Sequence, residues 1–499
     1  MDTAAAPTNP VAGDVVHLKG NTLTLFDTTA VAVASVAPAY SLAATIAFLV
    51  AAVGLASPAA ILVSFFPVLC IALAYYYMNR QEPNCGASYT WLSRTVSPYL
   101  GWFTGWVQTA ASVIFCISAS ALAATNTLAL LASFGWISGD AVNNGWLVAV
   151  IGLAWLAFVT WMVIRGIRLT ANFQWVMVGI EYLIVLGFSV LAFVKIASLH
   201  PTGSQAVQAW WFNPFSIQGF DGLAAGVVLG VFFFWGWDTA ANLNEESKDR
   251  SVTPGQAGVI SMFILLLVFL VGASAIQALV PAGTLEKQGD SAFFYFTQQL
   301  APAPWSYLGV LAVLTSTVAS TQTTLLPASR LTFSMARDRV FPRLFSMVHP
   351  RYQTPWVGTL IISGIAGLGL LLITASPNLN STFGDALANI GVLVALYYGL
   401  AGLACAWAFR KVLTRRASTL VLAGVLPAVG GLFLLWVGYE VVAQSGIQSS
   451  IPVLVTLGFG LPLLLLAVAL NRTGYFRQRT VTYGEGTGLA ESPQPATGE

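Results

Sequence analysis

Apolar residues follow one another along this chain in blocks of about twenty, separated by short polar segments. A helical block of that length crosses roughly 30 Å of hydrocarbon, so each block predicts a membrane-spanning helix. The sequence therefore predicts an all-α polytopic membrane protein with about twelve spans. We place them at residues 24–54, 57–78, 98–130, 145–164, 171–197, 222–244, 255–280, 303–329, 355–376, 384–409, 419–443 and 450–471.

Basic residues alternate with these spans and predict their orientation. Cytoplasmic segments of membrane proteins are enriched in lysine and arginine. With the N-terminus inside, 19 of the 21 basic residues fall in cytoplasmic segments, and only Lys195 and Lys287 fall outside. We therefore expect a cytoplasmic segment over residues 1–23, a transmembrane domain over 24–471 and a cytoplasmic, disordered tail over 472–499. The arginines between residues 330 and 343 are most simply a topology determinant beside anionic lipid.

The composition argues against several classes of function. Of 499 residues 57% are hydrophobic and 8% are charged, whereas soluble domains have about 25% charged residues. The four cysteines form no CxxC pair, and the three histidines lie outside the spans without metal-site spacing. Net charge is +2, and no stretch is both basic and aromatic as a nucleic-acid groove would be. We expect no enzymatic activity, no metal or other cofactor and no nucleic-acid partner.

Two spans contain a break at membrane depth. Residues 35–41 include Pro38, which removes a helical donor. Residues 230–238 form an aromatic run that meets Gly236 and then Asp238. The breaks are five spans apart, which predicts inverted repeats of about 24–197 and 222–409, each opening with a broken helix, plus two extra helices over 419–471. Unwound backbone there offers amides to an anion and carbonyls to a cation, although Pro and Gly also simply kink membrane helices.

These breaks belong to a wider resemblance. The second is followed by Asn-Glu-Glu-Ser at 244–247 and Thr-Pro at 253–254. Residues 328–342 read Ala-Ser-Arg, then Met-Ala-Arg-Asp-Arg-Val-Phe-Pro, and His-Pro-Arg at 349–351 precedes Thr-Pro at 354–355. Over about residues 20–475 the chain resembles permeases of the amino acid–polyamine–organocation superfamily. Two departures stand out: alanines and Pro38 replace the usual glycine-rich first break, and Arg339 replaces a common glycine.

The resemblance implies a secondary active transporter in the plasma membrane, such as a bacterial inner membrane. It would move amino acids or related amines by alternating access, with a proton as the coupling ion. A substrate exchanger and a sodium-coupled symporter are alternatives of the same fold, and a membrane sensor or intramembrane enzyme is a non-transport alternative. The bulkier Ala37 and Ala39 narrow the approach to the backbone amides and leave room for an amine or another related solute.

The resemblance also assigns roles to residues at the breaks. The substrate carboxylate would meet the first break at Ala37, Ala39, Tyr40 and Ser41. Carbonyls of Phe232, Phe233 and Trp235 would bind the amino group, and the Phe232 ring would close over the substrate as a gate. The alternative for the three consecutive phenylalanines is packing or lipid contact, since three in a row cover most of a helix circumference.

Two acidic side chains and a group of hydroxyls complete the prediction. Asp238 lies at membrane depth, where a charge costs about 2.5–3.5 kcal/mol on insertion scales. It would bind an ammonium group, take part in proton coupling or make a structural hydrogen bond. Glu181 lies in the middle of span five, where some proton-coupled relatives have a lysine near the first break, and is the other candidate for proton coupling. The alternative for Glu181 is a permanently neutral carboxyl that donates a hydrogen bond. The resemblance also gives a possible sodium site at Ser316, Thr317 and Ser320, for which helix packing is the alternative.

Overall fold

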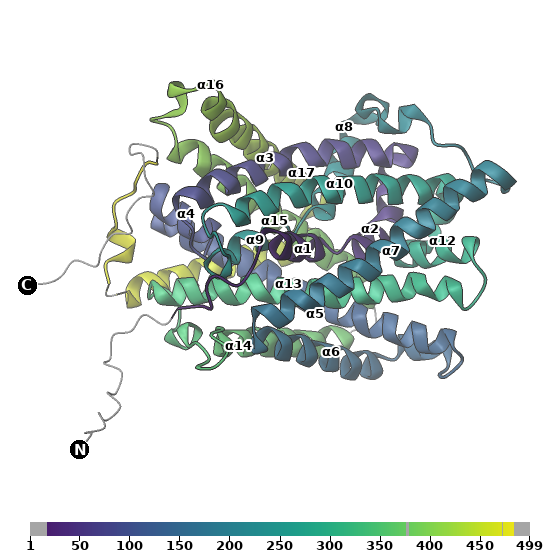
Figure 1. Ribbon diagram of the computed structural model, residues 1–499, viewed down its shortest axis with the longest axis horizontal. Coiled ribbons are helices and arrows are strands. Elements are labelled where there is room, and N and C mark those ends of the chain that lie inside the picture. Colours follow the sequence, from purple (N-terminus) through teal and green to yellow (C-terminus); the bar gives the residue numbers. More distant parts are fainter. Residues whose placement is uncertain (1–16, 376–378, 472, 484–499) are drawn as a thin grey trace, which may run out of the picture.

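The computed structural model describes residues 17–375, 379–471 and 473–483, without side chains at 290, 379–388 and 444–449. Of the described residues, 81% are helical. Its described residues form no β-strand, and Leu23 and Ser247 make an isolated parallel bridge. Long helices lie side by side and form an elongated bundle (Figure 1).

Ten helical stretches in the described residues are long and apolar enough to cross a membrane. The first, residues 25–81, contains the first two predicted spans, and the sixth span is the shorter apolar helix α8 (Gly219–Phe233). The remaining stretches match the other predicted spans, so the polytopic all-helical fold is confirmed. The long helices are α3 (Ser57–Gln81), α5 (Pro98–Ser133), α6 (Gly145–Arg165), α7 (Ile167–Leu199), α10 (Thr253–Leu279), α13 (Leu308–Arg337), α14 (Trp356–Thr374), α15 (Leu379–Ala408) and α17 (Leu426–Leu470).

The two predicted breaks are present and lie inside the bundle. The first separates α1 (Leu25–Val36) from α2 (Pro38–Val53). The second separates α8 from the short helix α9 (Thr239–Asn242). Helix α1 packs against α7, α10 and α13, so the first break is enclosed by other helices and does not face lipid. Freed backbone groups are tolerated at membrane depth in such a setting.

Several polar segments meet at one end of the bundle. Glu82, after α3, accepts a hydrogen bond from Tyr483, and Glu245, after α9, pairs with Arg337 at the end of α13. Leu23, before α1, pairs with Ser247. The positive-inside pattern assigns these segments to one side of the membrane, so their contacts agree with the alternation of the predicted spans.

The segment 473–483 corrects the expectation of a disordered tail from residue 472. It runs along α4 (Ser88–Thr95), where the Val481 amide donates to the Arg94 carbonyl at 2.8 Å. The Tyr483 amide donates to the Ala408 carbonyl at 2.9 Å, and the Tyr475 hydroxyl lies 2.5 Å from that of Ser93. Buried tyrosine rings and backbone hydrogen bonds hold this polar stretch in place. The rest of the predicted tail, residues 484–499, lies outside the described residues.

Candidate substrate site between two helix breaks

The first break is formed at Ala37, which adopts the left-handed conformation. Ala37 has φ 51° and ψ 67°, and its amide still donates to Ala34 at 3.1 Å. Pro38 then starts α2 at the position where a helix needs no amide hydrogen. The Ser41 hydroxyl donates to the Val36 carbonyl at 2.8 Å, which satisfies one acceptor that the break releases. The first amides of α2 are left to find partners elsewhere.

Glu181 supplies one of those partners from α7. The Ala39 amide donates to Glu181 Oε1 at 2.5 Å, and the Ser316 hydroxyl donates to the same oxygen at 2.8 Å. The Tyr40 amide in turn donates to Ser316 Oγ at 3.2 Å. Glu181 is fully buried, so its carboxyl lies inside the bundle at the N-terminus of α2, where the helix dipole favours negative charge. The expected approach of Glu181 to the first break is therefore seen.

The second break depends on Gly236. Its φ is +119°, a conformation that side-chain-bearing residues rarely adopt. A Cβ at this position would lie 2.6 Å from the Ser35 carbonyl oxygen and 3.1 Å from the Val36 amide nitrogen. The two broken helices thus touch at Gly236, and only a residue without a side chain allows this approach.

Asp238 follows this turn and is surrounded by uncharged donors. Tyr398 donates to its Oδ1 at 2.9 Å, and Tyr397 donates to its Oδ2 at 3.0 Å. Gln108 Nε2 lies 3.4 Å from the same Oδ2. The sequence interpretation missed these three residues. The available signals were a glutamine inside the apolar third span and a tyrosine pair inside the tenth.

Aromatic rings from the two breaks and from α5 pack against one another. Tyr40 packs against Phe115 and Phe232 with ring centroids 5.8 and 6.3 Å apart, and Phe115 packs against Trp235 at 5.2 Å. Trp235 Nε1 donates to the Tyr397 hydroxyl at 2.8 Å. The Phe232 ring therefore belongs to this group, as its predicted gating role requires. Phe115 was missed because one phenylalanine in an apolar span carries no distinguishing signal.

Phe233 does not join that group of rings. Its ring packs edge-to-face against Phe269 of α10, with centroids 4.8 Å apart. The Phe233 side chain therefore packs inside the bundle, which was the alternative for the three phenylalanines. The predicted substrate contact of Phe233 was through its backbone carbonyl and not through its ring. The Phe232 carbonyl already accepts the Trp235 amide at 3.1 Å within the turn.

Several buried polar atoms of this region have no hydrogen-bond partner in the described part of the chain. Trp237 Nε1 and the Tyr182 hydroxyl, next to Asp238 and Glu181 in the sequence, are two that can donate. Three more are the Tyr40 hydroxyl, Gln108 Oε1 and Glu181 Oε2. Buried polar groups are normally paired, and an unpaired one costs about 1–3 kcal/mol. The last three can accept a hydrogen bond, so together with Asp238 they form a set suited to a ligand that donates hydrogen bonds.

The hydroxyls of the possible sodium site are engaged in separate hydrogen bonds. Ser316 donates to Glu181, Thr317 donates to the Val313 carbonyl at 2.6 Å, and Ser320 donates to the Thr317 carbonyl at 3.0 Å. The last two bonds stay within α13, as hydroxyls in packed helices commonly do. Within the described residues, no group of three or more His, Cys, Asp or Glu side chains is arranged to hold a metal ion.

Beyond the second break, two ion pairs connect α13 to the segment after α9. Arg330 Nε and Nη2 donate to Glu246 at 3.0 and 2.9 Å, and both side chains are fully buried. Arg337 makes an equivalent two-bond contact with Glu245 at 3.1 and 2.8 Å. We call these four residues the ion-pair cluster. From the sequence we expected the arginines between residues 330 and 343 to lie beside anionic lipid. Arg330 and Arg337 instead pair with carboxylates inside the protein.

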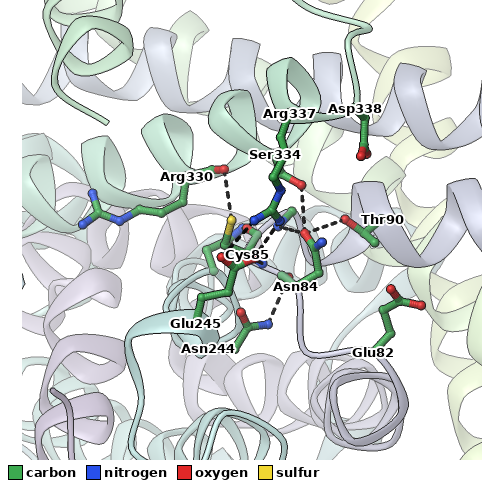
Figure 2. Close-up of polar contacts among 12 residues, drawn as sticks. Glu82, Asn84, Cys85, Thr90, Asn244, Glu245, Arg330, Ser334, Arg337 and Asp338 are labelled. Carbon is green, nitrogen blue, oxygen red and sulfur yellow. Dashed lines mark hydrogen bonds and ion pairs between the residues drawn. The ribbon is translucent and has the colours of Figure 1, made fainter. Parts of the chain in front are cut away.

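The loop between α3 and α4 completes this region. Figure 2 shows Asn84 among Thr90, Ser334 and Asn244. The Ser334 hydroxyl donates to Asn84 Oδ1 at 2.8 Å. The Cys85 amide donates to Glu245 at 3.1 Å. Burial alone would raise the pKa of Glu245, but the bonds from Arg337 hold the net pKa below the ordinary glutamate value. The ion-pair cluster therefore joins three segments at the same end of the bundle.

Comparison with known proteins adds a family. A family model described as amino acid permease matches residues 23–462. The low-affinity putrescine importer PlaP of Escherichia coli is 26% identical over 346 residues, which cover 68% of this chain and 71% of the importer. The branched-chain amino acid permease BcaP of Lactococcus lactis is 24% identical over 416 residues, covering 78% and 84% of the two chains. The methylthioribose transporter of Bacillus subtilis is 26% identical over 368 residues, covering 69% and 75%.

The match spans both broken helices, both carboxyls and the ion-pair cluster. It confirms the resemblance that the breaks and the basic loop indicated. This chain belongs to the amino acid permease family, within the amino acid–polyamine–organocation superfamily.

Proposed function

We propose that the protein is a proton-coupled secondary transporter that moves an amino acid or a related amine across a bacterial plasma membrane by alternating access. Both ends of the chain would lie in the cytoplasm. The observation that carries the proposal is a pair of buried carboxyls, one at each helix break. Neither Glu181 nor Asp238 forms an ion pair with a Lys or Arg of the described residues.

The surroundings of the two acids suggest different tasks. Three uncharged donors bind Asp238 and stabilise negative charge on its carboxylate. An ionised carboxylate has about four lone-pair positions that can accept hydrogen bonds. One of these positions is therefore left for an ammonium group of the substrate. On Glu181, Oε1 accepts two hydrogen bonds while Oε2 has no partner. A proton on Oε2 would remove the cost of an isolated buried charge. We assign substrate binding to Asp238 and proton transfer to Glu181.

The ion-pair cluster fits the role of a closed inner gate. It joins α13 to the segment that follows the second break, so the path toward that end opens only if these pairs separate. In alternating access, one group of helices rocks against another around a central site. The named functions of the relatives, which include a putrescine importer and a branched-chain amino acid permease, support the proposed range of substrates.

Uptake into liposomes tests the proposal. The purified protein is reconstituted, and labelled amino acids and amines are offered with an inward proton gradient, an inward sodium gradient or neither. We expect the proton gradient to drive accumulation of at least one solute, with Glu286→Gln on the exposed surface of α11 (Ala282–Gln288) as the unaffected control. Uptake that requires internal substrate would make the protein an exchanger, and a strict sodium requirement would contradict proton coupling.

A further inference from the structure

The position of Glu181 bears on what the substrate contains. The amides at the start of α2 form an anion site, because a helix N-terminus presents unpaired N–H groups and a positive dipole end. In this chain the Ala39 amide already donates to the Glu181 carboxyl, and the Tyr40 amide donates to Ser316, which donates to the same carboxyl. The protein thus places its own carboxyl where a substrate carboxylate would bind.

A substrate carboxylate would gain little binding free energy at the start of α2. It would compete with Glu181 for the same donors in either protonation state, and whenever Glu181 is ionised the two carboxylates would also repel each other. Trp237 Nε1, next to Asp238 in the sequence, is a donor without a partner, and three other side-chain atoms without partners can accept a hydrogen bond: Glu181 Oε2, Gln108 Oε1 and the Tyr40 hydroxyl. All three residues are at least nine-tenths buried.

The aromatic rings favour positive charge as well. Tyr40 at the first break, Phe232 and Trp235 at the second, and Phe115 of α5 pack against one another. The faces of such rings attract an organic cation, most strongly when it has lost its water. The region thus provides two carboxyls, unpaired acceptors and aromatic faces for a cation, and its anion-binding amides are already occupied.

We propose that the substrate is an organic amine without a carboxylate, and that Glu181 determines this selectivity by taking the place of the substrate's carboxylate. The inference rests on the proposed transport function and narrows its substrate class. Amino acids are excluded at the first break because Glu181 caps its amides, while the ammonium group is held near Asp238 and the aromatic rings.

Matched pairs of solutes that differ only in the carboxylate test this directly. We choose cadaverine with lysine, putrescine with ornithine, isoamylamine with leucine, and phenethylamine with phenylalanine, so that polar and apolar side chains are both sampled. Binding is measured by ligand-induced thermal stabilisation of the purified, full-length protein, which does not depend on proton coupling. In at least one pair we expect the amine to bind at least tenfold more tightly than its amino acid.

Two substitutions of Glu181 distinguish its capping of the α2 amides from the effect of its ionisable carboxyl. The glutamine of Glu181→Gln retains an oxygen that can accept from Ala39, so the preference for the amine should persist even though the proton-binding carboxyl is lost. Glu181→Ala uncovers the amides, and we expect the preference to shift at least tenfold toward the amino acid of the same pair. Glu286→Gln serves as the surface control and should bind like the wild type.

The outcomes distinguish this inference from the transport proposal. Selective binding of an amine without uptake would contradict transport and leave the assignment of Glu181 in place. Uptake of an amino acid with equal or tighter binding than its amine would overturn the inference while transport stands. Failure of every amine to stabilise the protein, or an unchanged preference in Glu181→Ala, would also overturn it.

Discussion

Replacing Gly236 by alanine is expected to abolish most transport. The new Cβ would lie 2.6 Å from the Ser35 carbonyl oxygen, and backbone atoms cannot yield as a flexible side chain would. The φ of +119° adds backbone strain of roughly 1–3 kcal/mol for a residue with a side chain. Relief requires the two broken helices to separate, which distorts the site between them. Since each 1.4 kcal/mol is a factor of ten, we expect uptake to fall by roughly tenfold or more.

The same substitution at another glycine provides the control. Gly364 lies within α14, and a Cβ added there would meet no atom within 4 Å. Gly364→Ala should therefore transport like the wild type in the same liposomes. Equal elution of both variants as monodisperse protein would show that the loss is local. Normal uptake by Gly236→Ala would contradict the direct contact between the breaks.

Breaking the buried ion pair should give the largest loss of stability. Arg330 and Glu246 are fully buried and make two hydrogen bonds, so removing one partner leaves a charge without water or a counter-charge. Such a loss costs about 3–5 kcal/mol. We expect Glu246→Gln and Arg330→Met each to lower the free energy of unfolding by that amount, measured by chemical denaturation in detergent micelles.

A double variant shows whether the cost comes from the unpaired charge. Arg330→Met combined with Glu246→Gln has neither charge, so its loss should be smaller than the sum of the two single losses. Lys248→Met, on an exposed side chain of the same segment, is the control and should change stability little. Additive losses in the double variant would show that the two side chains act independently, against the observed pairing.

Local sequence patterns predicted the fold well because lipid allows few solutions. Only segments with internally satisfied backbones can cross hydrocarbon, so apolar block length was enough to place the spans. The breaks were also predictable, since Pro38 and Gly236 change the backbone itself. Their direct contact was not, because it depends on how α1 and the turn after α8 pack in three dimensions.

The partners of the predicted residues needed the structure. An acid in an apolar span is unusual and marks Glu181 as a candidate, but nothing in the neighbouring sequence indicates that it caps the Ala39 amide 142 positions away. Tyr397 and Tyr398 look like ordinary apolar-span aromatics until they are seen to donate to Asp238. In the sequence, the arginines near residue 330 indicate only a topology signal, because sequence alone does not reveal that Glu245 and Glu246 pair with them.

Proton movement during amine entry tests the central claim most directly. Liposomes containing the protein and a trapped pH-sensitive dye receive an amine outside, with the membrane potential clamped by potassium and valinomycin. We predict that wild-type liposomes acidify inside as the amine enters, because each transport cycle brings in the proton held by Glu181, and that Glu181→Gln liposomes do not. Protein-free liposomes correct for uncharged amine, which diffuses in and shifts the interior pH the opposite way. Amine entry without acidification in the wild type, or equal acidification in Glu181→Gln, would contradict the account.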